Sequence, residues 1–143
     1  MFTVAHSITL ALAVFGALTL SSAIVEPLIA LSLVAVAVEA LASRSTEPSV
    51  RRVALVFAFG LLHGLGFAGG LTELNLERSA LGWTLAGFNL GVELGQLTVA
   101  AVGFGLLALT ARQAWHRPRV VVPLGVFIAA LGLYWTVERV ITA

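Results

Sequence analysis

Long apolar stretches separated by short polar segments form the dominant pattern of this chain. Five of these stretches are long enough for membrane-spanning helices, and they cover residues 2–20, 24–42, 53–71, 83–110 and 120–141. A helix needs about 20 apolar residues to cross the hydrocarbon core of a bilayer. The pattern therefore predicts an all-α, polytopic integral membrane bundle of about five transmembrane helices, in a single domain over residues 1–143.

Polar segments mark the expected boundaries of these helices. Ser21 and Ser22 predict a tight turn, residues 43–52 a loop, and residues 111–119 a basic loop. Residues 73–82 are partly amphipathic, which is typical of a segment that lies at the membrane interface. The first apolar stretch lacks the basic start of a secretory signal peptide, so we expect it to remain as a helix.

Composition excludes several classes of protein. Hydrophobic residues make up 59% of the chain and charged residues 10%, which is far from the composition of a soluble domain. Cysteine is absent and every acidic residue is Glu, so disulfides, thiolate metal sites and the Asp-dependent motifs of phosphoryl transfer are excluded. The net charge of +1 gives no reason to expect a nucleic acid as partner. We expect a lipid bilayer as the partner, and no enzymatic activity.

The arginines predict an orientation in the membrane. Five alternating spans would place the second and fourth loops on one side, and these loops hold most of the arginines. By the positive-inside rule, that side and the N-terminus are cytoplasmic, and the protein lies in the cytoplasmic membrane. The arginines concerned are Arg44, Arg51, Arg52, Arg112, Arg117 and Arg119, and only Arg78 and Arg139 oppose them.

Glycines spaced four apart predict where the helices meet. Helices in lipid associate through close backbone approach across small residues. On the fourth helix the glycines would form a continuous seam roughly opposite its polar residues, so we expect this helix to be central, with its small face against a neighbour. The glycines are Gly60 and Gly64, with Gly66 and Gly70, on the third helix, and Gly87, Gly91 and Gly95 on the fourth.

Four polar residues interrupt apolar stretches and are candidates for function. They are His63 in the third stretch, and Asn89, Glu93 and Gln96 in the fourth. Polar groups at such depth usually face a functional interior. His63 and Glu93 are about equally far from the turn between their helices, so we expect them to pair near mid-membrane, with Asn89 and Gln96 in support.

A second pair is expected closer to the cytoplasm. His6 and Glu39 are equally distant from the turn between the first two helices, which predicts similar depths for both and a depth for His6 different from that of His63. Glu26 is expected near the outer surface. Glu138, beside Arg139 in the last helical turn, is expected to form an anchoring pair with it.

Imidazole and carboxylate groups at several depths suggest the movement of a metal ion. Neutral imidazole with carboxylate and carbonyl oxygens suits nickel, cobalt, zinc or iron, and sites at successive levels let a dehydrated ion step across a membrane. We therefore predict a permease for a divalent transition-metal ion, with the ion as substrate and no permanently bound cofactor. A simpler alternative is that His63 and Glu93 only hydrogen-bond to hold the helices together.

Three other classes are weighed against transport. A haem-binding redox subunit would use His6 and His63 as axial ligands, but the expected difference in their depths opposes it. An intramembrane hydrolase would use Ser7 or a metal-bound water, yet the chain contains neither H-E-x-x-H nor G-x-S-x-G. An accessory or structural subunit of a larger membrane complex is favoured by the small size and the glycine seams.

Several segments together resemble the HupE/UreJ family of membrane proteins, over nearly the whole chain. They are FTVAHSITLALA, IVEPLIALSLVAVAVEAL, FAFGLLHGLGFA, GFNLGVELGQL and GLYWTVERV. The resemblance implies a nickel or cobalt permease associated with hydrogenase, urease or cobalamin metabolism. It places His6 and Ser7 in the His-Ser motif, His63 in the His-Gly motif, and Asn89, Glu93 and Gln96 in the Asn-x-Gly-x-Glu-x-x-Gln motif.

The chain departs from the pattern of that family in two places. Members usually carry another helix, with a Gly-x-Asp-His signature, before the Phe-Thr-x-x-His-Ser motif, whereas this chain begins at that motif and contains no Asp. We therefore expect either a truncated or divergent member, or a homo-oligomer or partner chain that supplies the helix. Glu39 is followed by Ala40 where members commonly have Glu-Asn, which removes one amide ligand or hydrogen-bonding partner near the inner site.

Overall fold

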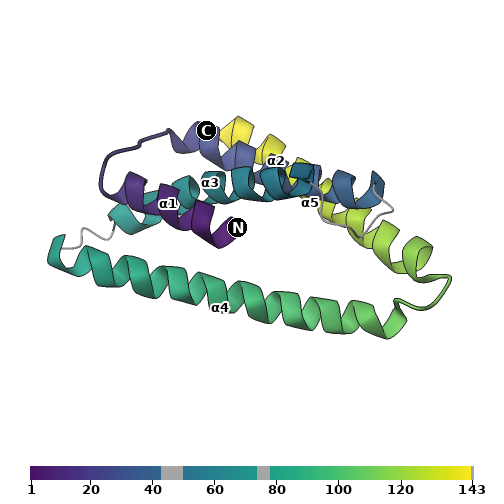
Figure 1. Ribbon diagram of the computed structural model, residues 1–143. Coiled ribbons are helices and arrows are strands. Elements are labelled where there is room, and N and C mark those ends of the chain that lie inside the picture. Colours follow the sequence, from purple (N-terminus) through teal and green to yellow (C-terminus); the bar gives the residue numbers. More distant parts are fainter. Residues whose placement is uncertain (43–49, 74–77, 143) are drawn as a thin grey trace.

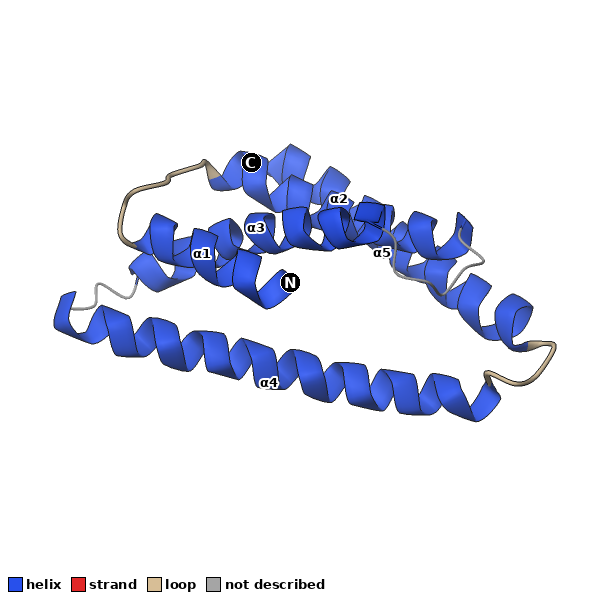
Figure 2. Ribbon diagram, viewed as in Figure 1, coloured by secondary structure: helices blue, strands red, loops and turns tan. Residues whose placement is uncertain are grey.

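The computed structural model describes residues 1–42, 50–73 and 78–142, and in this part of the chain all regular structure is helical. The expected all-α fold class is confirmed (Figures 1 and 2). A π-helical turn, η1, leads directly into the last helix. The elements are α1 (Phe2–Val14), α2 (Ser22–Ala42), α3 (Val50–Glu73), α4 (Arg78–Thr110), η1 (Arg117–Val121) and α5 (Val122–Thr142).

Four of these helices are long and apolar enough to cross a membrane. They are α2, α3 as far as Gly69, α4 from Ala80, and η1 together with α5. Their bounds agree with the predicted spans to within a few residues. Large apolar side chains point outward along them, among them Leu90, Phe104 and Phe127. Such a surface suits a protein whose solvent is lipid.

The first helix is shorter than predicted. It ends at Val14 rather than at residue 20, so α1 is only about 20 Å long against a hydrocarbon core of about 30 Å. Gly16 takes a positive φ of 75°. The Gly16 amide donates to Ala13 and the Ala17 amide to Leu12, which is the Schellman arrangement that ends a helix. Gly16 therefore stops the helix, and an extended segment leads to α2 in place of the expected tight turn (Figure 2).

Two glycines let α1 lie directly on α3. A Cβ atom at Gly60 would lie 2.6 Å from the Phe2 carbonyl oxygen, and one at Gly64 would lie 2.9 Å from the Leu10 nitrogen. Thr9 also donates a hydrogen bond of 2.8 Å to the Leu61 carbonyl oxygen on α3. The predicted close approach at Gly60 and Gly64 is confirmed. Because residue numbers rise together along both helices at these contacts, α1 runs parallel to α3.

The remaining contacts join α2, α3 and α5. A Cβ atom at Gly132 of α5 would lie 2.9 Å from the Val34 side chain of α2. At the other end of α5, Arg117 Nη2 donates a hydrogen bond of 2.7 Å to the Leu41 carbonyl oxygen. Figure 1 shows α1, α2, α3 and α5 gathered together. The bundle therefore rests on backbone approach at small residues, as expected for helices in lipid.

Helix α4 lies at the edge of the bundle, which contradicts the expected central position (Figure 1). The most apolar stretch of this helix contains no buried residue. A Cβ atom at Gly87, Gly91 or Gly95 would meet nothing within 4 Å, so the glycine seam has no packing partner within the described residues. Only the first part of α4 is packed, where Leu85 joins Leu10 and Ala68 in a small buried cluster.

Parts of two predicted segments lie outside the described residues. Of the loop at 43–52, residues 50–52 belong to α3, and 43–49, including Arg44, lie outside. Of the interfacial segment at 73–82, residue 73 ends α3 and residues 78–82 belong to α4.

Candidate metal site

The most unusual polar group in the described part of the chain is the imidazole of His6. Its residue is 0% exposed, and neither ring nitrogen has a hydrogen-bond partner among the described residues. The rings of Phe2, Phe67 and Phe88 surround it, with centroids 6.1, 5.7 and 6.3 Å away. A buried polar atom without a partner is costly and calls for an explanation such as an ion. The residues here fit a metal ion, because neutral imidazole nitrogen is a preferred ligand for nickel, cobalt and zinc.

The second imidazole, on His63 of α3, belongs to the same region. His63 Nδ1 lies 2.8 Å from the Phe59 carbonyl oxygen. Because that oxygen can only accept, Nδ1 carries the proton in the neutral ring and Nε2 carries the lone pair. Such a backbone contact is the usual way in which a ligating histidine is oriented. His63 is therefore set up to offer Nε2 to a metal ion.

Phe2 connects the two histidines. Its ring centroid lies 6.1 Å from that of His6, with which it is stacked, and 5.3 Å from that of His63, which it meets edge-on. The two imidazoles therefore lie at similar depth, and the expected difference in depth was wrong. The reason is the parallel packing of α1 on α3, which brings Phe2 and His6 to the middle of α3.

Asn89 reaches the same region from α4. Ser7 Oγ donates a hydrogen bond of 2.9 Å to Asn89 Oδ1, and Asn89 Nδ2 donates one of 3.0 Å to the Leu85 carbonyl oxygen. The amide is thereby held beside the residue that follows His6. The His-Ser motif and the first residue of the Asn-x-Gly-x-Glu-x-x-Gln motif thus meet at the junction of α1 and α4.

The structure does not bring Glu93 and Gln96 to His63. Both residues are exposed on the outer part of α4, and no hydrogen bond or ion pair joins them to His63 within the described residues. His63 lies about 15 Å from the end of α3 at Glu73, whereas Glu93 lies about 22 Å from the start of α4. The unequal depths and the edge position of α4 account for the separation.

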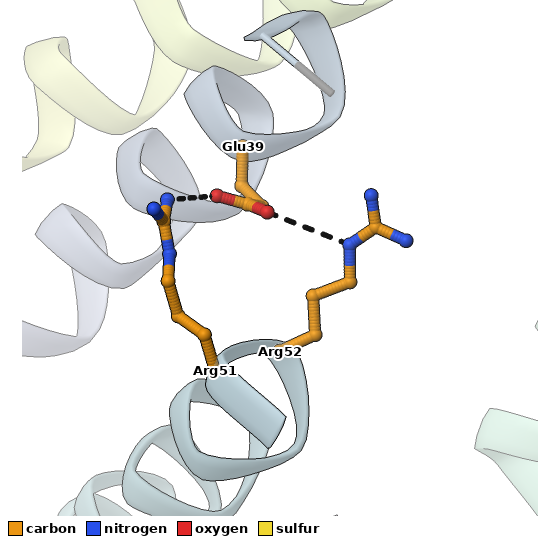
Figure 3. A network of polar contacts seen from close by, with 3 residues as sticks. All are labelled: Glu39, Arg51 and Arg52. Carbon is orange, nitrogen blue, oxygen red and sulfur yellow. Dashed lines mark hydrogen bonds and ion pairs between the residues drawn. The ribbon is translucent and has the colours of Figure 1, made fainter. Parts of the chain in front are cut away.

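Glu39 is likewise placed apart from His6. It forms ion pairs with Arg51 and, at 3.5 Å, with Arg52 at the start of α3 (Figure 3). His6 lies about 12 Å from the end of α1, but Glu39 lies about 25 Å from the start of α2. The pairing of His6 with Glu39 rested on a helix that continues to residue 20, and the early end of α1 removes the basis for it.

A cavity that the sequence did not reveal opens between α2, α3 and α5. It has a volume of about 500 Å³ and includes Glu26, His63, Phe67, Trp135 and Arg139 in its lining. Arg139 Nη1 lies 3.0 Å from Glu26 Oε2, so Arg139 pairs with Glu26 rather than with its neighbour Glu138. The sequence held one signal for this pair: Glu26 and Arg139 carry opposite charges, and each lies about one helical turn from the end of an apolar span.

The described histidines and acids do not form a complete metal shell. Within residues 1–42, 50–73 and 78–142, no group of three or more His or Glu side chains lies close enough together to hold a metal ion. His6 and His63 would therefore need oxygen ligands to complete the shell, and the nearest amide described is that of Asn89, whose Oδ1 accepts a hydrogen bond from Ser7, the residue after His6.

Comparison with known proteins yields a family match. The family model described as HupE / UreJ protein matches residues 1–139, which is nearly the whole chain. No curated protein and no solved structure matches the chain. With its apolar helices, the match makes this a multi-pass membrane protein with a connection to nickel or cobalt.

Proposed function

The chain belongs to the HupE/UreJ family, and on that premise we propose that it carries a divalent transition-metal ion, nickel or cobalt, across the cytoplasmic membrane. The observation that carries this proposal is the fully buried imidazole of His6, with two unpartnered nitrogens, close to the oriented imidazole of His63. Two neutral imidazoles inside an apolar bundle select borderline divalent ions over calcium and magnesium. The ion is the substrate, and the protein itself performs no covalent chemistry and keeps no cofactor.

The proposed ligands form a central metal site and further ion-binding positions outside it. His6 and His63 form the centre, with Asn89 as a nearby amide ligand held by Ser7. Glu93 and Gln96 continue the polar face of α4 beyond Asn89, and we propose them as ligands that approach when α4 moves inward. Glu39 is a further proposed ion-binding position, near the end of α2, where an ion would compete with Arg51 and Arg52 for the carboxylate.

The proposed orientation keeps the arginine-rich end of the bundle in the cytoplasm. Arg51, Arg52 and Arg117 lie at the end where α2 meets α3 and α5, and the positive-inside rule places such an end in the cytoplasm. The start of α2 and the end of α5 then face outward. An ion taken up from outside would meet Glu26 before His63.

Transport can be tested with purified protein in vesicles. We expect nickel or cobalt uptake by the parent chain, and a loss of uptake of about tenfold or more in His63→Ala and His6→Ala, because each removes a charge-stabilising ligand. His116→Ala is the matched control, since His116 is the N-cap of η1, just before the span that begins at Arg117, and its Nδ1 is 2.8 Å from Thr110 Oγ1. Unchanged uptake in both His6 and His63 variants would overturn the proposal.

One observation favours a second candidate, an accessory subunit of a larger membrane complex. The glycine seam of α4 meets no packing partner within the described residues, and a second copy or another membrane helix would cover it. Recovery of the protein from mild detergent as a defined single-chain species that transports nickel would exclude this candidate.

A haem-binding subunit fits the site less well, although the two histidines lie at similar depth. A porphyrin needs far more open space beside the imidazole than a single ion does, and three phenylalanine rings pack around His6. A Soret band in the purified protein would reverse this conclusion.

A further inference from the structure

The cavity between α2, α3 and α5 extends from His63 to residues that belong to none of the His-Ser, His-Gly and Asn-x-Gly-x-Glu-x-x-Gln motifs. It is lined on α2 by Glu26 and Ile29, on α5 by Trp135 and Arg139, and on α3 by residues that include His63. His63 is the link between the two regions, because its ring also meets Phe2 edge-on. Phe67 also lines the cavity and its ring centroid lies 5.7 Å from that of His6, so an ion in the cavity is separated from His6 by His63 and Phe67.

Charge is concentrated at one end of this cavity. Glu26 lies near the start of α2 and Arg139 near the end of α5, and they are the only charged residues among the described residues that line it. Their side chains are 44% and 52% exposed. An ion pair that exposed is weak and exchanges readily, so the Glu26 carboxylate is accessible to a competing cation.

The size of the cavity suits an ion that still carries water. Its volume is about 500 Å³, and six water molecules at about 30 Å³ each would fit with room to spare. The apolar wall formed by Phe67, Ile29 and Trp135 offers no ligands to replace those waters. Hydration is therefore kept until the imidazole of His63 is reached.

We propose that this cavity is the vestibule through which a hydrated divalent cation reaches His63, and that Glu26 binds the cation first while Arg139 competes for the same carboxylate. The proposal rests on the function proposed above and adds a binding residue, Glu26, and a residue that opposes binding, Arg139. A divalent ion attracts the Glu26 carboxylate more strongly than a guanidinium does, because its charge is twice as large. The arriving ion displaces Arg139, and Arg139 then helps to drive the ion onward to His63.

If Glu26 binds the ion and Arg139 competes with it, substitutions of these two residues should change the KM for uptake in opposite directions. Glu26→Gln leaves the positive charge of Arg139 uncompensated in the vestibule, and we expect the KM for nickel uptake to rise by about tenfold or more. Arg139→Gln frees the carboxylate, and we expect KM to fall. Glu138→Gln is the matched control, because Glu138 neighbours Arg139 but lines a different groove on α5. If the pair were only structural, both variants would raise KM or reduce the folded fraction alike, and that result would overturn the proposal.

A second measurement does not depend on transport. The chain has no cysteine, so Ile29→Cys introduces a single thiol into the wall of the vestibule. We expect a membrane-impermeant methanethiosulfonate reagent to modify it, and nickel to slow the modification in a Glu26-dependent manner. Leu94→Cys, on the exposed apolar face of α4, should resist the same reagent in vesicles because lipid covers it.

The two measurements separate the vestibule from the proposed function. Absent uptake in the parent, with nickel-protected labelling at residue 29, would reject transport and retain the vestibule. Uptake that needs His63, with labelling at residue 29 absent or unaffected by nickel, would reject the vestibule and retain transport.

Discussion

A Cβ atom at Gly64 of α3 would collide with Thr9 Oγ1 of α1, so the two helices can approach this closely at Thr9 because residue 64 is glycine. Thr9 in turn donates a hydrogen bond of 2.8 Å to Leu61. The same contact brings the backbone of His6 against Gly64. The position of the buried imidazole therefore depends on a residue that has no side chain.

Gly64→Ala should push α1 away from α3. Overpacking of this kind costs about 1–3 kcal/mol, and we expect that loss in the free energy of unfolding measured in detergent, together with weaker nickel binding. Gly91→Ala is the control, because a Cβ atom there meets none of the described residues within 4 Å. That variant should be neutral, or more stable by up to about 1 kcal/mol, since Ala favours helix over Gly. Equal stability of the two variants would show that α1 does not pack as described.

His6→Phe should separate stability from function. The new ring is similar in shape and removes two buried nitrogens without partners, so we expect the metal-free protein to gain about 1–3 kcal/mol in stability. Nickel should raise the melting temperature of the parent but not that of the variant, because binding to the folded state alone stabilises it. A metal-free variant that melts below the parent would mean that the His6 nitrogens already have partners.

Hydropathy alone was sufficient to predict most of the fold. The ranges of α2, α3, α4 and α5 follow from the length of apolar runs, because lipid allows only long helices to cross it. The end of α1 could not be read from hydropathy, since apolar residues continue on both sides of Gly16. The Phe15-Gly16 pair was no clear signal either, because Phe59-Gly60 and Phe104-Gly105 are the same pair inside α3 and α4.

The hydrogen bond between Ser7 and Asn89 should couple α1 to α4. It measures 2.9 Å between Ser7 Oγ and Asn89 Oδ1, and interhelical bonds of this kind contribute about 0.6–2 kcal/mol. A double-mutant cycle with Ser7→Ala and Asn89→Ala should return a coupling energy in that range in unfolding experiments. Strictly additive effects would indicate that α4 does not reach α1 at this point.

The ion pairs of Glu39 should depend on salt. Arg51 is largely exposed, with 74% of its side chain accessible, so screening by solvent ions acts on it. We expect Glu39→Gln to lower stability by less than about 1 kcal/mol at low ionic strength, with the difference shrinking at 1 M salt. Glu138→Gln provides a comparison at a carboxylate far from these arginines. A salt-independent loss in Glu39→Gln alone would point to a buried role for this carboxylate.

The candidate site was only partly predictable, for a topological reason. His6, His63 and Asn89 stand out in the sequence because polar groups are rare in apolar helices. Which of these side chains meet depends on the length of the connections and on the parallel packing of α1 on α3. Neither can be predicted from the spacing of polar residues along the sequence. Glu26 and Arg139 form an ion pair although they are 113 residues apart in the sequence, so local pattern could not connect them.

The coordination of nickel in the purified protein tests the central claim most directly. X-ray absorption at the nickel edge should detect two imidazole ligands in the parent, one in His6→Phe or His63→Ala, and two in the His116→Ala control. An oxygen-only shell in the parent, or a spectrum that neither the His6 nor the His63 substitution alters, would contradict a metal site built on these two histidines.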